Sequence, residues 1–152
     1  FNYRVSEMQS ALGISQLSRL DEQLEHKEDL AVFYDRNLAG IDGLELAPRP
    51  QWATAQSWDM YSIIVETLPI RDNVVGFLTA SGIDTRLGFP PIHNQPYYRE
   101  NFGHKPEDLP ITMDIWERKI DLPSWPQMTD QQRLRVVHAV RVALGEARSL
   151  DQ

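Results

Sequence analysis

The stretch Trp58-Asp59-Met60-Tyr61-Ser62-Ile63-Ile64-Val65 decides the fold class of this chain. It is rich in aromatic and β-branched residues, which fit the pleated surface of a sheet, so we predict a strand over 58–65. The apolar spacing that follows predicts a helix over 71–81, with Gly82 as its left-handed stop. Further strands are predicted over 83–87 and 120–122.

Towards the amino terminus, the sequence predicts one long helix. Ser6 and Gln9 have the spacing of a capping box, and apolar residues then recur at intervals of three, four or seven. The pattern runs over about 6–39, ends at Gly40 and is followed by a short strand over 44–46. Such a length is unusual in a small domain, so we expect this helix to bridge to another domain or to lie along a subunit contact.

Towards the carboxyl terminus, helices are predicted over 109–118 and after Thr129. Three prolines exclude regular structure from 89 to 98. The residues expected to point inward from the last helix are Leu134, Val137, Val140, Val142 and Leu144. The order of elements predicts an α+β fold, in which a small, largely antiparallel sheet is covered by helices, as one domain over residues 1–152.

Composition narrows the classes of function. The chain has 152 residues, of which 41% are hydrophobic, and a net charge of -7 from 15 basic and 22 acidic residues. That balance argues against a nucleic-acid partner. No apolar run approaches the roughly 20 residues of a membrane span, and no Cys is present for disulfides or thiol chemistry. The chain starts at Phe1 without a leader pattern, and we expect it to be a piece of a longer protein.

Two segments carry candidate binding residues. Arg86 and His93 lie on a proline-rich stretch that suits an anionic ligand such as a diphosphate, although a purely structural loop is the plainer interpretation. Asn2 and Arg4 precede a helix N-terminus, where a phosphate can bind, although a frayed terminus is the plainer interpretation. The histidines lack metal-ligand spacing, so no metal site is predicted.

Three motifs together resemble one known family. Residues 1–13, Phe-Asn-Tyr-Arg-Val-Ser-Glu-Met-Gln-Ser-Ala-Leu-Gly, are similar to the N-Y-R-x-S-x-x-Q-A-A-x-G pattern of the DegT/DnrJ/StrS sugar aminotransferases. Residues 82–86 and 90–98 resemble that family's G-I-x-T-R and P-x-H-x-Q-P-x-Y patterns. Residues 121–126 resemble its S-L-P-x-x-P. The resemblance covers nearly the whole chain in order.

This resemblance implies the C-terminal small domain of a pyridoxal-phosphate enzyme with the aspartate-aminotransferase fold type. Such enzymes, which serve amino sugar biosynthesis, move an amino group from glutamate to a keto sugar carried by a nucleotide diphosphate. The lysine that holds the cofactor lies upstream of the matching stretch in the family. None of this chain's three lysines lies in an apolar setting that would suit that role. We therefore expect no catalytic residue here and no transaminase activity from the isolated chain.

The resemblance also assigns binding residues. Asn2 would reach the cofactor phosphate of the neighbouring subunit in a homodimer, with Arg4 close by. Arg86 and His93 would border the nucleotide-sugar pocket. Gly88-Phe89 departs from the family, which often has His or Tyr and then Tyr there, and this leaves the sugar preference open. The family resemblance further implies a cytoplasmic enzyme.

Two other functions stay open. Some relatives replace the cofactor-bearing lysine with His and dehydrate a sugar instead, and that position lies outside this sequence. The second alternative is a free-standing, non-catalytic module that binds a sugar nucleotide. If the first helix packs on another domain, Met8, Leu12 and Leu17 will be uncovered in the isolated chain. We therefore predict that the isolated chain self-associates.

Overall fold

The fold was analysed in a computed structural model that describes residues 3–150, with side chains described as far as residue 145. It confirms the predicted α+β class. The helices are α1 (Glu7–Leu17), α2 (Leu20–Leu38), α3 (Leu68–Ala80), α4 (Pro96–Phe102), α5 (Pro110–Arg118) and α6 (Asp130–Leu150), with short 3-10 turns η1 (Ile92–Asn94) and η2 (Pro106–Asp108). The strands are β1 (Leu44–Leu46), β2 (Tyr61–Val65) and β3 (Lys119–Leu122).

The three strands form one antiparallel sheet with β2 in the middle. Alternate residues of β2 are buried, namely Tyr61, Ile63 and Val65. Because side chains of a strand alternate between faces, these three share one face of the sheet, and Ser62 lies on the other. The sheet therefore has an apolar face and a face that carries polar residues.

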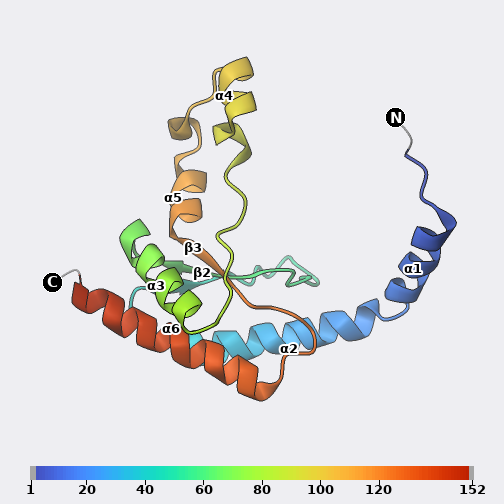
Figure 1. Ribbon diagram of the computed structural model, residues 1–152, viewed down its shortest axis with the longest axis horizontal. Helices are drawn as coiled ribbons and strands as arrows, with labels where there is room; N and C mark the ends of the chain where they lie inside the picture. The colour runs from blue at the N-terminus through green and yellow to red at the C-terminus, as the bar shows by residue number, and fades with distance from the viewer. Residues whose placement is uncertain (1–2, 151–152) are drawn as a thin grey trace.

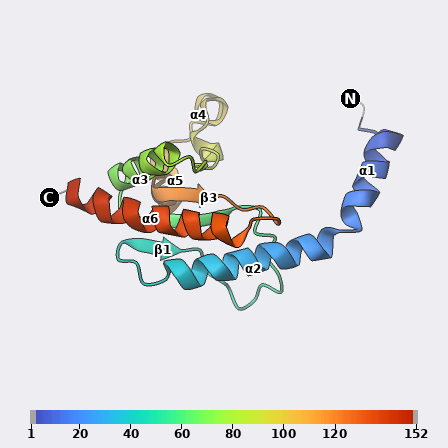
Figure 2. The same ribbon diagram turned by 60° about the horizontal axis from the view of Figure 1, so that its bottom comes forward.

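Helices α2, α3 and α6 supply the rest of the core against the apolar face (Figure 2). The rings of Tyr34 on α2 and Tyr61 on β2 lie 4.9 Å apart. The hydroxyl of Tyr34 donates to the carbonyl of Pro123 at 2.9 Å, which satisfies a polar group inside the core. Burial raises the pKa of Tyr34 far above its usual range, because the ionised form would lose its hydration.

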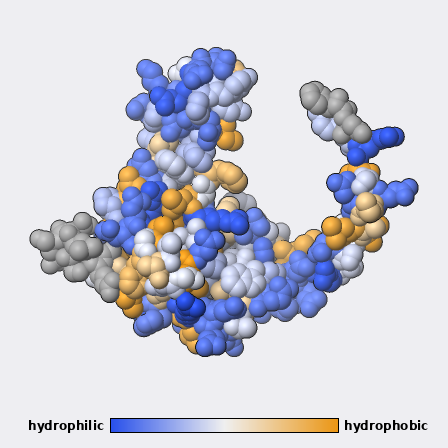
Figure 3. Space-filling view, in the orientation of Figure 1, coloured by the Kyte–Doolittle hydropathy of each residue, from blue (hydrophilic) through white to orange (hydrophobic). Residues whose placement is uncertain are grey.

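Two parts of the chain project from this body. Figure 1 shows α4 and α5 rising from the sheet as an arm, while α1 extends from the far end of α2. In Figure 3 the arm and α1 stand as separate projections. No residue of α1 is buried, and the exposure expected for Met8, Leu12 and Leu17 is confirmed. Among the described residues, no helix is long and apolar enough to cross a membrane.

The prediction of one helix over about 6–39 is wrong in one respect, since the structure has two helices. The backbone N–H of Ser18 bonds to the carbonyls of Ile14 and Gln16, and the hydroxyl of Ser18 donates to Ser15 at 2.9 Å. Arg19 then leaves the helical region, with φ -114° and ψ 6°. The predicted capping box is confirmed, because Ser6 and Gln9 bond to each other's backbone amides.

The predicted strand over 83–87 is reduced to a single bridge between Arg86 and Asp121. The backbone N–H of Ile83 is already bonded to Leu78 at the end of α3, so it is not available for a ladder. At the other end, Gly88 has φ 71° and turns the chain away from the sheet.

Three further predictions are corrected. The strand predicted over 58–65 starts only at Tyr61, because Trp58 has a positive φ of 45°. Regular structure does occur between 89 and 98, since Pro96 opens α4, where its missing N–H costs nothing. Leu134 is 55% exposed, because the buried stripe of α6 runs through Val136, Val140 and Leu144 and leaves Leu134 to one side.

Candidate functional site

Arg86 is held to the edge of the sheet by its backbone. Its N–H donates to the carbonyl of Asp121 at 3.1 Å, and the N–H of Asp121 donates back at 2.7 Å. Residues that exchange both bonds in an antiparallel pair lie directly opposite each other, with their side chains on the same face. The guanidinium of Arg86 is exposed and has no ion pair or hydrogen bond with any described residue. Arg86 thus has a fixed backbone and a guanidinium that has no partner among the described residues.

Three further polar residues occupy the same face of the sheet beside Arg86. The carboxylate of Asp121 is almost completely buried, and its Oδ1 accepts from the Ser62 hydroxyl at 2.5 Å. The ammonium of Lys119 lies 3.1 Å from that oxygen. These three residues were not among the candidates predicted from the sequence. The alternation Lys119-Ile120-Asp121-Leu122 was the signal, because it places two charges on one face of a predicted strand.

His93 lies elsewhere, in η1, the 3-10 turn that leads into α4. It is 8% exposed, and its Nε2 faces the carbonyl of Pro106 at 3.4 Å. Gln95 closes the same turn by donating to the carbonyl of Pro90 at 3.2 Å. His93 therefore ties the proline-rich segment to the turn before α5, and the structure does not bring it together with Arg86.

A cavity of about 560 Å³ opens beside Arg86. Its walls come from the segment after α3, the end of β3, the start of α6 and the middle of α2. Arg86, Asp121 and Trp125 line it, and His93 is absent from the lining. The volume lies in the range of small-molecule sites, and a free guanidinium at its edge suits an anionic group.

The two residues predicted near a phosphate can be placed only in part. Asn2 lies outside the described residues. Arg4 is exposed two positions before Ser6, the N-cap of α1. A guanidinium just before a helix N-terminus has the donor chemistry that a phosphate needs, so the position of Arg4 is compatible with the expected phosphate contact.

Each of the three lysines is either ion-paired or exposed. Lys27 pairs with Asp59 at 3.6 Å, Lys119 pairs with Asp121, and Lys105 is exposed. None lies in the apolar setting that a cofactor-bearing lysine requires. Among the side chains that the structure describes, which end at residue 145, no group of three metal-ligating side chains occurs.

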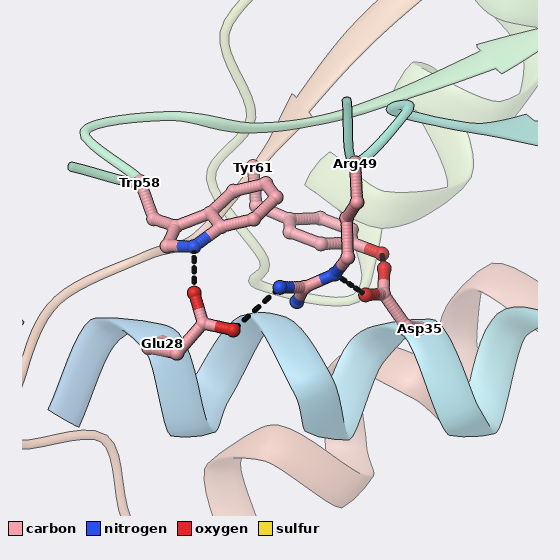
Figure 4. Close-up of polar contacts among 5 residues, drawn as sticks. All are labelled: Glu28, Asp35, Arg49, Trp58 and Tyr61. Atoms are coloured by element: carbon pink, nitrogen blue, oxygen red, sulfur yellow. Dashed lines mark hydrogen bonds and ion pairs between the residues drawn. The ribbon is translucent and has the colours of Figure 1, made fainter. Parts of the chain in front are cut away.

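A polar cluster on α2 was also not foreseen from the sequence (Figure 4). Arg49 binds Glu28 at 2.5 Å and Asp35 at 2.6 Å, and its guanidinium lies 4.7 Å from the centre of the Trp58 ring. The indole N–H of Trp58 donates to Glu28, and the hydroxyl of Tyr61 donates to Asp35 at 2.6 Å. These bonds fasten the segment between β1 and β2 onto α2. Because each charge has a partner within the cluster, we assign it a structural role.

Comparisons with known proteins agree on one protein family. The model of the DegT/DnrJ/EryC1/StrS aminotransferase family matches residues 1–141. The chain is 31% identical to the spore coat polysaccharide biosynthesis protein SpsC of Bacillus subtilis over 145 residues, which cover 93% of this chain and 37% of that protein. It is 32% identical to GDP-perosamine synthase of Vibrio cholerae over 143 residues, covering 93% of this chain and 38% of that protein. The chain thus spans less than two fifths of these curated relatives.

Solved structures share the fold. DesV of S. venezuelae, solved in complex with a ketimine intermediate, superimposes with a TM-score of 0.82 at 33% identity, over 91% of this chain and 36% of that one. PseC of Helicobacter pylori, an aminotransferase involved in pseudoaminic acid biosynthesis, gives a TM-score of 0.86 at 24% identity, over 96% and 39%. The three-stranded sheet and its helices are therefore a recurrent part of larger enzymes.

Proposed function

Since the chain belongs to the DegT/DnrJ/EryC1/StrS aminotransferase family, we propose that it is the C-terminal domain of a pyridoxal-phosphate-dependent sugar aminotransferase. The observation that carries the proposal is the family match over residues 1–141, which includes both Asn2–Arg4 and the Arg86–His93 segment. The reaction is transfer of an amino group from glutamate to a nucleotide-linked keto sugar. The full enzyme would act as a cytoplasmic homodimer.

In this proposal, the residues of this chain bind and orient the cofactor and the sugar nucleotide, and they do not take part in the chemical step. Pyridoxal phosphate, when bound, draws electrons from the carbon that carries the amino group. Asn2 and Arg4 would hold its phosphate across the dimer interface. Arg86 would bind the diphosphate of the sugar nucleotide, since its backbone is held by that of Asp121 and its guanidinium has no partner among the described residues. His93 does not line the cavity beside Arg86 and would act indirectly, by anchoring the proline-rich segment that follows Arg86.

The proposal also accounts for the exposed apolar residues of α1. This helix has an exposed apolar side and no buried residue, so it contributes nothing to the core of the isolated chain. We propose that α1 and α2 bridge to a larger domain that carries the cofactor-bearing lysine. Contact with that domain would cover the apolar residues of α1.

The decisive experiment uses the native protein that contains this chain. Its intact mass should exceed twice 17.5 kDa. With pyridoxal phosphate and glutamate, it should aminate a nucleotide keto sugar, and the substitution Arg86→Gln should raise KM for the sugar nucleotide more than it lowers kcat. The 152-residue chain serves as the control and should show no turnover. Turnover by that chain alone, or a native mass near 17.5 kDa, would contradict the proposal.

A further inference from the structure

We propose that Lys119 is a positioning residue, which holds the carboxylate of Asp121 away from Arg86 and so keeps the Arg86 guanidinium available for an anionic group. The inference deepens the proposed function, because it rests on that proposal for the identity of the anion, the diphosphate of the sugar nucleotide. By pairing with Asp121, Lys119 leaves the positive charge of Arg86 available at the edge of the sheet.

Arg86 and Asp121 lie opposite each other but do not form an ion pair. Arg86 and Asp121 face each other across an antiparallel bridge, and such residues have Cβ atoms roughly 5 Å apart on the same face. An Arg and an Asp in that relation would ordinarily bind each other. Here Asp121 Oδ1 is bound to the Ser62 hydroxyl and the Lys119 ammonium instead. Arg86 has no partner among the described side chains.

Burial explains why Asp121 requires a cation at this place. The Asp121 side chain is 2% exposed, and its Oδ2 has no hydrogen-bond partner among the described residues. A buried carboxylate is costly unless a charge or donors compensate it. Lys119 supplies that charge from two positions earlier on the same face of β3, and its own side chain remains 21% exposed. Lys119 and Arg86 both lie beside the Asp121 carboxylate, and Lys119 is the one that forms the ion pair with it.

Gly88 makes this arrangement possible. Its φ of 71° carries the chain past the ammonium, and a Cβ at this position would lie 3.2 Å from Lys119 Nζ and 3.6 Å from Asp121 Oδ2. An alanine at this position would require the Lys119 ammonium to shift by a few tenths of an ångström, in addition to holding a positive φ. Gly88 is also one of the two positions at which the sequence departs from the His or Tyr of the resembled pattern. The glycine thus leaves the space that Lys119 occupies.

The test measures binding of inorganic pyrophosphate to the 152-residue chain by NMR titration, following the backbone amide signals of residues 84–87, which every variant retains. The parent should bind, and Arg86→Gln should abolish the response. Lys119→Met should weaken binding about fivefold, because the released carboxylate of Asp121 pairs with Arg86. The double variant Lys119→Met with Asp121→Asn should recover to within about twofold of the parent, since it removes the competing carboxylate.

Matched variants separate this effect from net charge and from folding. Lys119→Met with Glu100→Gln has the same net charge as Lys119→Met with Asp121→Asn but keeps Asp121. Its binding of pyrophosphate should remain as weak as that of Lys119→Met. Lys105→Met removes an exposed Lys from the arm and should bind within about twofold of the parent. Gly88→Ala keeps every charge and should weaken binding by displacing Lys119, which preserves the test if Lys119→Met does not fold.

The inference is overturned if the parent does not bind pyrophosphate, if both Lys119→Met and Gly88→Ala bind like the parent, or if the double variant is no better than Lys119→Met. The last result would mean that Lys119 contacts the anion itself. The titration uses no cofactor and no keto sugar. It can therefore fail while transamination by the longer protein stands, and transamination can fail while pyrophosphate binding stands.

Discussion

Tyr61 illustrates how single residues hold this chain together. Its ring lies in the core beside Tyr34, while its hydroxyl donates to Asp35 at 2.6 Å on the surface of α2. Burial and this hydrogen bond raise the pKa of Tyr61 well above its usual value of 10.0. The folded state therefore favours the neutral phenol. The stability linked to Tyr61 is complete below pH 10 and is lost as the pH rises above that value, because the unfolded chain then ionises.

We expect Tyr61→Phe to lower the free energy of unfolding by about 1 to 2 kcal/mol at pH 7, since the hydrogen bond to Asp35 is lost. Above pH 10 the difference in the free energy of unfolding between the variant and the parent should shrink, because the variant has one fewer tyrosine that ionises on unfolding. Urea melts at pH 7 and pH 11 measure both effects. Tyr97→Phe, at an exposed position on α4, should match the parent at both values. A constant gap between Tyr61→Phe and the parent would refute the linkage.

At the scale of elements, the end of α3 shows how one residue sets the course of the chain. Gly82 follows Ser81 with φ 70°, a conformation that costs an L-residue about 1 to 2 kcal/mol. A Cβ there would also lie 3.3 Å from the guanidinium of Arg135, which donates to the carbonyl of Ser81 at 2.6 Å. This stop directs the chain towards the bridge that carries Arg86.

Two Gly→Ala substitutions on this helix should have opposite signs. Gly82→Ala should destabilise the fold by about 1 to 2 kcal/mol through its positive φ. Gly76→Ala should stabilise it by up to about 1 kcal/mol, because Gly76 lies inside α3 with nothing within 4 Å of the added methyl group. Thermal melting of both variants provides the measurement. Destabilisation by Gly76→Ala would show that the outer surface of α3 is less open than the structure indicates.

At the scale of the whole molecule, the body and α1 differ in what stabilises them. The core joins α2, α3, α6 and the sheet, whereas α1 buries nothing and exposes a run of apolar residues. An exposed apolar patch of this kind favours association. Met8 is 84% exposed and Leu12 61% exposed in the middle of it.

We therefore expect the isolated chain to self-associate with rising concentration, and Leu12→Glu to weaken this association. Leu134→Glu introduces the same charge at an exposed position of α6 and should leave it unchanged. Light scattering over a concentration series measures the average mass of each variant. A parent chain that stays monomeric at high concentration would remove the argument that α1 needs a covering surface.

The sequence by itself determined the class of fold and the family. The aromatic and β-branched residues of β2, the helical spacing in α3 and the capping box at Ser6 are local signals, and each indicated the right type of element because it depends on neighbours within a few positions. The three motifs pointed to the family for the same reason, since they are contiguous in the chain. Element ends were less accurate, as at Trp58 and at the break between α1 and α2, because backbone geometry decides them.

The tertiary structure alone decided which charges meet. Ser62 and Asp121 are 59 positions apart, yet they share one hydrogen bond across paired strands. Arg86 and His93 are close in sequence, yet one lies at the sheet edge and the other in η1. Strand pairing and the turn at Gly88 set these relations. No local pattern encodes them, because partner choice depends on register and burial over the whole chain.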